Sequence, residues 1–262
     1  MMENLPETGA EYTVKVTILK DRVTLTVDTS GSGLHKRGYR VKTVAAPIKE
    51  TLAAAMVQLS FWNKDRVLLD PCCGSGTIAI EAAMIGRNIA PGLSRSFACE
   101  EWEAIDKKLW KEEKKRAYDL MDDEAKLDIV AIDIDKMAIE AAKENAIEAG
   151  VDDCIRFINA DMARIKASKP SGIIITNPPY GERIGEQKQI AAIYSKYKKF
   201  FAENQSWSMF MVTTDKDIEA KVFGRKADRR RKLYNGRLEV CYYQFHGKKL
   251  GDNGKAKQPE QK

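Results

Sequence analysis

The chain of 262 residues lacks the marks of a membrane-spanning, disulfide-stapled or zinc-binding protein. No apolar run approaches the ~18 residues that cross a membrane, and residues 1–10 show no basic segment followed by an apolar one. The five cysteines have no CxxC spacing, and the only histidines are His35 and His246. These absences argue against disulfides and a Cys/His metal site. We therefore predict a cytoplasmic protein that binds neither a membrane nor a metal, and no pattern indicates an oligomeric state.

Charge is distributed unevenly along the chain. Residues 183–262 hold 19 Lys and Arg against 9 Asp and Glu, whereas residues 1–182 hold 25 against 29. The densest basic run, residues 221–237, contains eight basic residues and one acid. A basic run can be a solvated face, but beside an acidic first part it indicates a polyanionic partner.

Residues 12–28 have the pattern of a β-hairpin. Apolar and polar residues alternate over 12–19 and 22–28, on either side of Lys20 and Asp21, which predicts two strands with one buried face. A Gly-rich basic loop follows at residues 30–40. We expect residues 1–45 to form this hairpin and loop ahead of the main domain.

Residues 46–246 alternate strand and helix patterns and are expected to form the main domain. Strands are predicted at residues 66–69, 129–132, 155–158, 172–176 and 208–212, and helices at 47–62, 77–85, 136–149 and 190–203. Asn235-Gly236, flanked by residues 232–234 and 238–245, is a strong hairpin signal. The expected fold is α/β, with a Rossmann-like, doubly wound, mostly parallel seven-stranded sheet that ends in an antiparallel hairpin. Residues 100–126 are interpreted as a charged insertion, and residues 247–262 as a disordered tail.

A glycine turn follows the first strand of the main domain. The strand ends in Asp70, the chain turns through Gly74 and Gly76, and a helix begins at Thr77. Gly74, Gly76 and Ala79 also match the nicotinamide pattern G-x-G-x-x-A, which alone is weak evidence. Asp70 would repel a pyrophosphate but suits a cationic ligand.

Two further acids follow strands, Asp133 and Asp161. Asp133 can accept both hydroxyls of a ribose, and Asp161 can accept from an adenine amino group. Three strands that end in acids around a glycine turn suit S-adenosylmethionine, which carries an ammonium and a sulfonium and no phosphate. We therefore predict S-adenosylmethionine as the cofactor.

A stiff loop follows the fourth strand, formed by Asn177, Pro178, Pro179 and Tyr180. Proline fixes φ and removes a donor, so this segment cannot continue a helix or a central strand. The side-chain oxygen of Asn177 and the carbonyl of Pro178 can accept both hydrogens of an aryl amine and aim its lone pair at a sulfonium methyl. Tyr180 can stack on the base. We predict these four residues to be catalytic.

These motifs resemble the class I S-adenosylmethionine-dependent methyltransferases that modify amino groups. Residues 34–40, 46–50, 70–81, 90–92 and 233–236 are similar to 23S ribosomal RNA guanine-N2 methyltransferases with a THUMP RNA-binding domain. The resemblance spans nearly the whole chain, residues 12–245. The cofactor-binding residues that it implies, together with the strand ends, are Asp70, Pro71, Cys72, Gly74, Ser75, Gly76, Thr77, Asp133, Ile134, Asp161, Met162 and Asn177.

The resemblance departs at the N-terminus. The family's THUMP domain precedes the hairpin, whereas only about ten residues precede it here. We therefore expect this chain to be part of a longer protein, with residues 1–45 as the remnant of a linker to an RNA-binding domain.

The expected substrate is RNA, with guanine N2 of ribosomal RNA favoured. The residues expected to contact RNA phosphates are Lys36, Arg37, Arg40, Arg229, Arg230, Arg231 and Lys232. The same catalytic loop serves adenine-N6 and protein-glutamine methyltransferases, so these remain alternatives. An inactive RNA-binding module and a nicotinamide oxidoreductase are alternatives of other classes.

Overall fold

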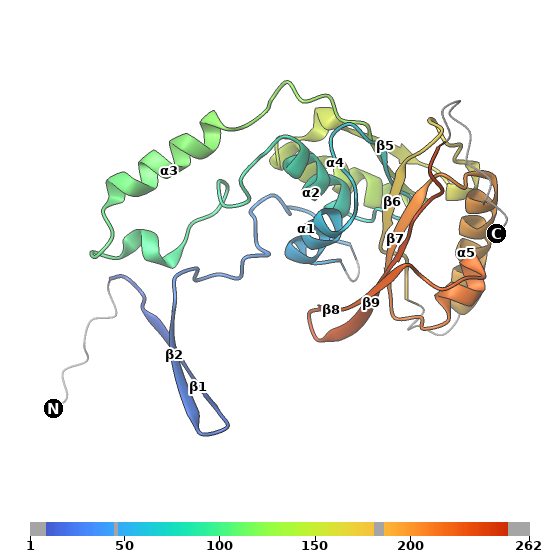
Figure 1. Cartoon of the computed structure of the whole chain (residues 1–262). Helices are drawn as coiled ribbons and strands as arrows, with labels where there is room; N and C mark the ends of the chain where they lie inside the picture. The colour runs from blue at the N-terminus through green and yellow to red at the C-terminus, as the bar shows by residue number, and fades with distance from the viewer. Residues whose placement is uncertain (1–8, 45–46, 181–185, 251–262) are drawn as a thin grey trace.

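A single large sheet organises the main domain in the computed structural model, which describes residues 9–44, 47–180 and 186–250. The sheet has seven strands in the order β5-β4-β3-β6-β7-β9-β8 (Figure 1). Pairs among β5, β4, β3, β6 and β7 are parallel, and β9 pairs antiparallel with both β7 and β8. The strands are β3 (Leu68–Asp70), β4 (Ile129–Asp133), β5 (Ile155–Asn159), β6 (Ile173–Thr176), β7 (Ser208–Thr213), β8 (Arg229–Asn235) and β9 (Leu238–Phe245).

Helices cover both faces of the sheet, with α1, α2 and α4 on one face and α5 on the other (Figure 1). Their bounds are α1 (Glu50–Leu59), α2 (Thr77–Gly86), α3 (Lys107–Asp119), α4 (Lys136–Glu148) and α5 (Glu186–Glu203). Short helical turns lie at η1 (Ala98–Glu101), η2 (Asp152–Cys154), η3 (Met162–Arg164) and η4 (Glu219–Phe223), the last of them π-helical. The carboxylate of Asp135 caps α4 by accepting from Met137 N at 2.8 Å. No helix within the described ranges is long and apolar enough to cross a membrane.

Two apolar clusters follow from strands that are buried on both faces. Leu68, Ile129 and Ile173 face the helices α1, α2 and α4. Leu69 and Val130 point the other way and pack with Tyr197 of α5. Continuous burial of successive residues is the pattern of a parallel sheet covered by helices on both sides. The predicted α/β class, the seven strands and the closing antiparallel pair are confirmed.

Strand β8 is longer than its sequence pattern indicated. The prediction placed a strand at residues 232–234, whereas β8 begins at Arg229, which pairs with Gln244 of β9. Cationic side chains are compatible with an edge strand because its outer side faces solvent. The three arginines at 229–231 therefore lie on a strand and not in a loop.

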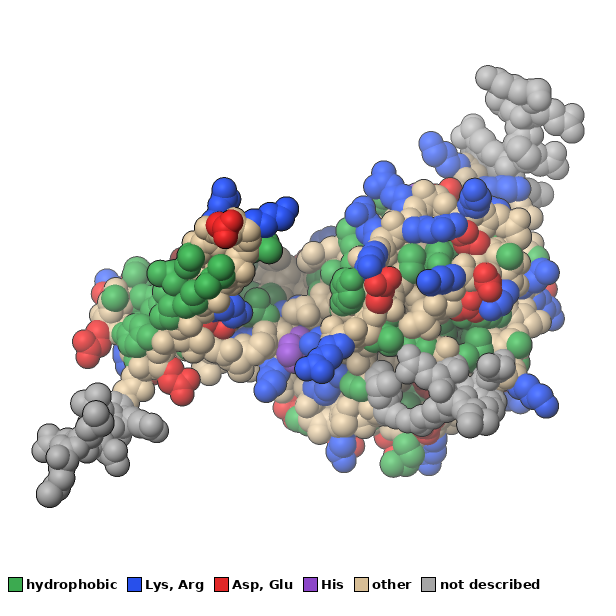
Figure 2. Space-filling model, turned by 90° about the horizontal axis from the view of Figure 1, so that it is seen from below, with side chains coloured by type: hydrophobic (Ala, Val, Ile, Leu, Met, Phe, Trp, Pro, Cys, Tyr) green, Lys and Arg blue, Asp and Glu red, His purple; other side chains and the backbone are tan. Residues whose placement is uncertain are grey.

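The N-terminal hairpin forms as predicted from β1 (Thr13–Leu19) and β2 (Arg22–Asp28), but the predicted burial of its apolar face is wrong. The exposed fractions of Val16 and Leu25, which face each other across the hairpin, are 58% and 68%. The hairpin projects away from the sheet, and apolar side chains gather at that end of the molecule (Figures 1 and 2). Alternation predicted the strand pairing correctly but could not show whether another element covers it.

The predicted insertion and tail are only partly regular in structure. Within residues 100–126, α3 begins at a cap in which Asp106 accepts from Lys108 N at 2.8 Å. The expected disordered tail begins at Gly247, yet Gly247 N donates to Ser208 Oγ at 3.0 Å and Lys248 N to the Gln205 carbonyl at 2.8 Å. Residues 251–262 of that tail lie outside the described residues.

Gly76 provides a test of the close packing between α2 and α4. It has φ +82°, and a Cβ there would lie 2.9 Å from Ala142 Cβ, whereas Gly150, with φ +67°, has nothing within 4 Å. Both Gly→Ala changes lower the free energy of unfolding by roughly 1–2 kcal/mol, because alanine is strained at positive φ. Gly76→Ala lowers it by about 1–3 kcal/mol more through overpacking against Ala142. Urea unfolding should therefore show Gly76→Ala to be the less stable variant by at least about 1 kcal/mol. Equal losses would contradict the packing argument.

Candidate active site

The site lies where the strand order reverses. Strand β3 has β4 on one side and β6 on the other, so the loops after these strands diverge at the carboxyl edge of the sheet. A cleft of about 830 Å³ opens there. Its lining from the strand-end loops is Pro71, Cys72, Gly74, Ser75, Asp133, Ile134, Ala160, Asp161, Met162, Asn177, Pro178, Pro179 and Tyr180. Val44, Pro47 and Ile48 line it from the segment before α1, and Gln189, Ala192, Ile193 and Lys196 from α5.

Asp133 joins the loop after β3 to the loop after β4. Gly74 N donates to its Oδ2 at 2.9 Å, and Asp135 N donates to its Oδ1 at 3.0 Å. A carboxylate oxygen has lone pairs for more than one donor, so Asp133 keeps acceptor capacity toward the cleft. The glycine turn and the end of β4 are therefore held as one unit.

Asp161 is held by a lysine from α5. Lys196 Nζ lies 2.7 Å from both Asp161 oxygens, and Ala163 N donates to Oδ1 at 2.8 Å. The backbone donor first, and then Lys196, lower the pKa of the Asp161 carboxyl. Asp161 is therefore a carboxylate, and a new donor must share it with Lys196.

Asp70 lies beneath the glycine turn and does not line the cleft. Its side chain is fully buried, its Oδ1 accepts from Cys72 N at 3.4 Å, and its Oδ2 has no partner among the described residues. Burial raises the pKa of Asp70 well above its usual value, and the nearby Asp133 raises it further. Gly76 and Thr77 also stay outside the cleft lining and form the start of α2.

Cys72 lies on the cleft floor as a neutral thiol. Its Sγ is 3.7 Å from the Tyr197 hydroxyl, which lies 2.9 Å from Thr176 Oγ1. Burial raises the pKa of Cys72 to about 12. The thiolate that a nucleophilic cysteine needs is therefore disfavoured at neutral pH.

The Asn-Pro-Pro-Tyr loop forms one wall of the same cleft. Tyr180 OH donates to Asn177 Oδ1 at 2.5 Å, Pro178 is buried and Pro179 is exposed. The loop follows β6 directly, so the sheet fixes its first residue beside the glycine turn. The four residues predicted to be catalytic and most of those predicted to bind the cofactor thus come together.

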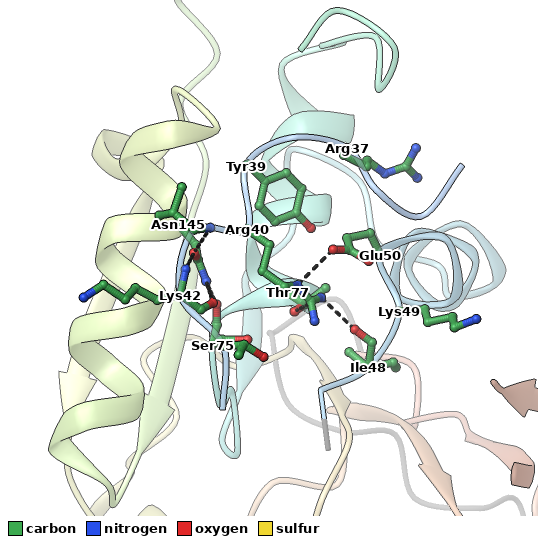
Figure 3. A network of polar contacts seen from close by, with 12 residues as sticks. Arg37, Tyr39, Arg40, Lys42, Ile48, Lys49, Glu50, Ser75, Thr77 and Asn145 are labelled. Atoms are coloured by element: carbon green, nitrogen blue, oxygen red, sulfur yellow. Dashed lines mark hydrogen bonds and ion pairs between the residues drawn. The ribbon is translucent and has the colours of Figure 1, made fainter. Parts of the chain in front are cut away.

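Arg37 and Arg40, expected at RNA phosphates, lie in internal ion pairs instead. Arg37 Nε is 2.8 Å from Glu81 Oε1. Arg40 Nε is 2.9 Å from Glu50 Oε1 (Figure 3). Glu50 and Glu81 are both buried, so each arginine compensates a carboxylate that has lost its water. Lys36, by contrast, is exposed and forms no ion pair with another described residue.

The predicted RNA contacts on β8 differ among themselves. Arg229 is exposed and has no ion-pair partner within the described part of the chain. Arg230 pairs with Glu219, and Lys232 Nζ lies 2.6 Å from Glu239 Oε2. Arg231 is half-buried. Lys and Arg side chains are spread over the main domain in the view of Figure 2.

Sequence reasoning missed two side chains that shape the site. Lys196 lies one and two helical turns from Ile193 and Gln189 on α5, and this spacing could have placed them on one face. Asn145 of α4 is 1% exposed and donates to the Ser75 carbonyl at 3.1 Å. The sequence could have indicated Asn145, because an amide within the Ala-rich apolar stripe of a helix is expected to be buried, and a buried amide needs hydrogen-bond partners.

The arrangement of sheet, glycine turn and strand-end acids defines a Rossmann-like methyltransferase fold. The chain belongs to the family of RMKL-like methyltransferase domains, whose model matches residues 37–244. The family resemblance predicted from the sequence is therefore confirmed.

Two relatives in sequence are longer than this chain. "Putative RNA methyltransferase YpsC" of Bacillus subtilis is 48% identical over 244 residues, which cover 93% of this chain and 63% of that protein. "Ribosomal RNA large subunit methyltransferase K/L" of Shewanella baltica is 39% identical over 254 residues, which cover 93% of this chain and 35% of that protein. The chain spans less than two thirds of the length of either.

Solved structures show the same fold. SMU.472, crystallised in complex with SAH, superposes with a TM-score of 0.87 at 44% identity, covering 95% of this chain and 65% of that one. A protein from Listeria monocytogenes, described as a predicted N6-adenine-specific DNA methylase, superposes with a TM-score of 0.85 at 45% identity. The match covers 92% of this chain and 62% of that one. TrmN from Thermus thermophilus, with 19% identity and a TM-score of 0.61, shares the fold alone.

The buried carboxyl of Asp70 predicts a pH dependence of stability. Its pKa is raised in the folded chain, so above about pH 4 the unfolded state loses this proton first and folding becomes less favourable as pH rises. Asp70→Asn removes this titration. From pH 4 to 8, urea unfolding should show Asp70→Asn gaining stability over the parent chain, by about 1 kcal/mol or more.

Asp161→Asn is the matched control, because the pKa of Asp161 is lowered and its stabilising effect is complete above about pH 5. Its stability difference from the parent should stay constant from pH 5 to 8. A constant difference for Asp70→Asn as well would contradict the assignment of a retained proton.

Proposed function

We propose that this chain is an S-adenosylmethionine-dependent methyltransferase that methylates an exocyclic amine of a base in RNA, with guanine N2 of ribosomal RNA as the favoured target. One observation carries the proposal: the Asn-Pro-Pro-Tyr loop and the acids Asp133 and Asp161 line the same cleft. An amine acceptor site and a nucleoside site are thereby adjacent. The names of the RNA methyltransferase relatives and the SAH-bound structure support it.

The residues of the cleft fit the donor. Asp133 has acceptor capacity for ribose hydroxyls, and Asp161 is an ionised acceptor for an adenine amino group. Asp70 lies outside the cleft lining and its buried Oδ2 has no partner among the described residues, so an ammonium bound close to it would favour the ionised form of this carboxyl. Gly74 and Ser75 present backbone without bulky side chains at the same edge. When bound, S-adenosylmethionine supplies a methyl group on a sulfonium.

The Asn-Pro-Pro-Tyr loop positions the amine. Asn177 Oδ1 and the Pro178 carbonyl accept the two amine hydrogens, which draws the nitrogen out of conjugation and orients its lone pair. In this structure Asn177 Oδ1 accepts from Tyr180 OH, so an entering amine replaces that hydroxyl. The ring of Tyr180 stacks on the base. No strong general base is required, because the nitrogen becomes cationic on methyl transfer and its proton can then pass to water.

RNA contacts are proposed at exposed cations, chiefly Lys36, Arg229, Arg230 and Lys232. Lys36 and Arg229 offer charge without first breaking an ion pair with another described residue. Lys232 pairs with the exposed Glu239, and surface pairs contribute only about 0–1 kcal/mol, so a phosphate can replace this partner. Arg230 pairs with the largely buried Glu219, but its own side chain is exposed and can contact a phosphate while the pair is kept. A base must leave its stack to reach the cleft, which favours a single-stranded or flipped target.

Adenine N6 is the second candidate, favoured by the description of the Listeria monocytogenes relative as an adenine-specific DNA methylase. The loop presents acceptors to any planar amine and therefore does not separate guanine N2 from adenine N6. The basic residues fit either nucleic acid.

Product analysis tests the proposed function. The chain is incubated with S-adenosylmethionine and ribosomal RNA that lacks modifications, and nucleosides are identified by mass spectrometry. We expect N2-methylguanosine from the parent chain. Asn177→Ala should lower kcat by about 100-fold or more, with donor affinity within about twofold, because it removes an acceptor aimed at the reacting amine. Asn204→Ala is the control with unchanged activity, because it removes an amide that, among the described residues, donates to Phe200 O just past the end of α5.

The nucleoside formed separates the candidates. N6-methyladenosine would replace guanine N2 by adenine N6 and leave the reaction class intact. Absence of any methylated nucleoside, in RNA and in DNA, would contradict the proposed activity.

Tyr180 separates the role of the ring from that of the hydroxyl. Tyr180→Phe keeps stacking and removes the hydroxyl that occupies Asn177 Oδ1, so kcat/KM should stay within about threefold. Tyr180→Ala loses base stacking, which contributes about 1–3 kcal/mol, so kcat/KM should fall by about 10- to 100-fold. Steady-state kinetics with Tyr118→Ala, an exposed tyrosine on α3, provide the control. Equal loss in Tyr180→Phe and Tyr180→Ala would rule out stacking as the main role.

A further inference from the structure

One wall of the cleft is formed by a segment that is neither helix nor strand. The segment before α1 crosses the start of α2 beside α4 (Figure 3), and we call its residues 37–44 and 47–49 the strap. Val44, Pro47 and Ile48 of the strap line the cleft. Because the strap lacks a regular hydrogen-bond ladder, side chains must fix its position.

Asn145 is the first of these side chains. It projects from α4, its Oδ1 accepts from Val41 N at 3.0 Å and from Lys42 N at 2.9 Å, and its Nδ2 donates to the Lys42 carbonyl at 2.9 Å. The second hydrogen of Nδ2 goes to the Ser75 carbonyl at 3.1 Å. All four hydrogen-bonding positions of the amide are thus used. One side chain connects the strap to the glycine turn.

Arg40 is the second side chain that fixes the strap. Its Nη2 donates to the Ile48 carbonyl at 2.8 Å and to Thr77 Oγ1 at 3.0 Å, and its Nε lies 2.9 Å from Glu50 Oε1 (Figure 3). Thr77 is the first residue of α2, and Glu50 the first of α1. The guanidinium therefore connects the strap's cleft-lining Ile48 to the starts of two helices.

A third anchor lies farther from the cleft. Arg37 Nε and Tyr39 OH contact Glu81 Oε1 of α2 at 2.8 and 2.9 Å. This pair fixes the beginning of the strap on the body of the domain. Arg40 and Asn145 act beyond it, on the part of the strap that reaches the cleft.

We propose that Arg40 and Asn145 are positioning residues that hold the strap wall against the glycine turn and thereby set the affinity for the methyl donor. Neither residue lines the cleft, so they act through Ile48, Val44 and Ser75 and touch no ligand themselves. The inference rests on the proposed function, because the ligand concerned is S-adenosylmethionine. It also assigns Arg40 a role other than RNA binding.

The test measures donor binding separately from turnover. Calorimetric titration with S-adenosylmethionine and S-adenosylhomocysteine should show Kd raised at least tenfold in Asn145→Ala and in Arg40→Met. The KM for the donor should rise in parallel, whereas kcat at saturating donor should stay within about threefold, because the Asn177 loop belongs to the other wall. Arg40→Lys keeps the charge near Glu50 but reaches fewer acceptors, so its Kd should fall between those of Arg40→Met and the parent.

Arg87 provides the matched control. It is a buried arginine at the far end of α2 that pairs with Asp153 and donates to the carbonyls of Gly150 and Asp123. Arg87→Met should lower thermal stability as Arg40→Met does, yet leave Kd for the donor unchanged. If Arg40→Met or Asn145→Ala fails to fold, Arg40→Lys and Asn145→Ser carry the same comparison.

Each outcome has a defined meaning. If the parent chain binds the donor and the Arg40 and Asn145 variants bind it equally well, the inference is wrong and the proposed function stands. If Arg40→Met raises the KM for RNA alone, Arg40 is an RNA contact and the inference is wrong for it. If Arg87→Met weakens donor binding as much, general destabilisation is the cause and the inference fails. A parent chain that binds no donor overturns the proposed function itself.

Discussion

The hydrogen bond from Gly74 N to the Asp133 carboxylate is the contact on which the cleft depends. Parallel pairing of β3 and β4 brings their following loops to one edge, and this bond joins them there. Gly74 has φ +52°, a conformation that glycine adopts without strain, so its N–H can turn toward the acid. Asp133 also accepts from Asp135 N, which fixes the carboxylate before a ligand arrives. An acceptor oriented in advance loses little conformational freedom on binding.

The two walls of the cleft are stabilised in different ways. Strand ladders fix the starting points of the glycine turn and of the Asn-Pro-Pro-Tyr loop. The strap lacks a strand ladder and is held by side-chain contacts, among them those of Arg37, Tyr39, Arg40 and Asn145 and the bond from Lys49 N to Asn235 Oδ1 at 3.3 Å. The strand-end wall therefore takes its geometry from the sheet, whereas the position of the strap depends on these side chains and on the burial of Tyr39 and Ile48 in the core.

Local chemistry made the fold and the strand-end part of the site predictable from the sequence. Asn235-Gly236 specifies a tight hairpin turn, and the prolines at 178 and 179 exclude a helix or central strand, whatever the rest of the chain does. The partners of Arg37 and Arg40 were not predictable in the same way. Glu81 lies 44 residues after Arg37, so only the tertiary structure brings these charges together. The exposed apolar face of the hairpin has the same cause, because alternation specifies a pairing and not what covers it.

Whether a cationic side chain can bind RNA depends on whether its carboxylate partner is buried. A count of charges along the sequence does not show this. Separating Arg37 from Glu81 or Arg40 from Glu50 would leave a buried carboxylate without compensation, a cost of about 3–5 kcal/mol. Arg230 and Lys232 face solvent, and the exposed partner of Lys232, Glu239, can be exchanged for a phosphate with release of counterions. The basic residues near the cleft thus fall into two groups: arginines whose ion pairs stabilise the fold, and exposed cations that can contact RNA phosphates. In this chain the division runs between the strap, whose arginines face inward, and β8, where Arg229, Arg230 and Lys232 face solvent.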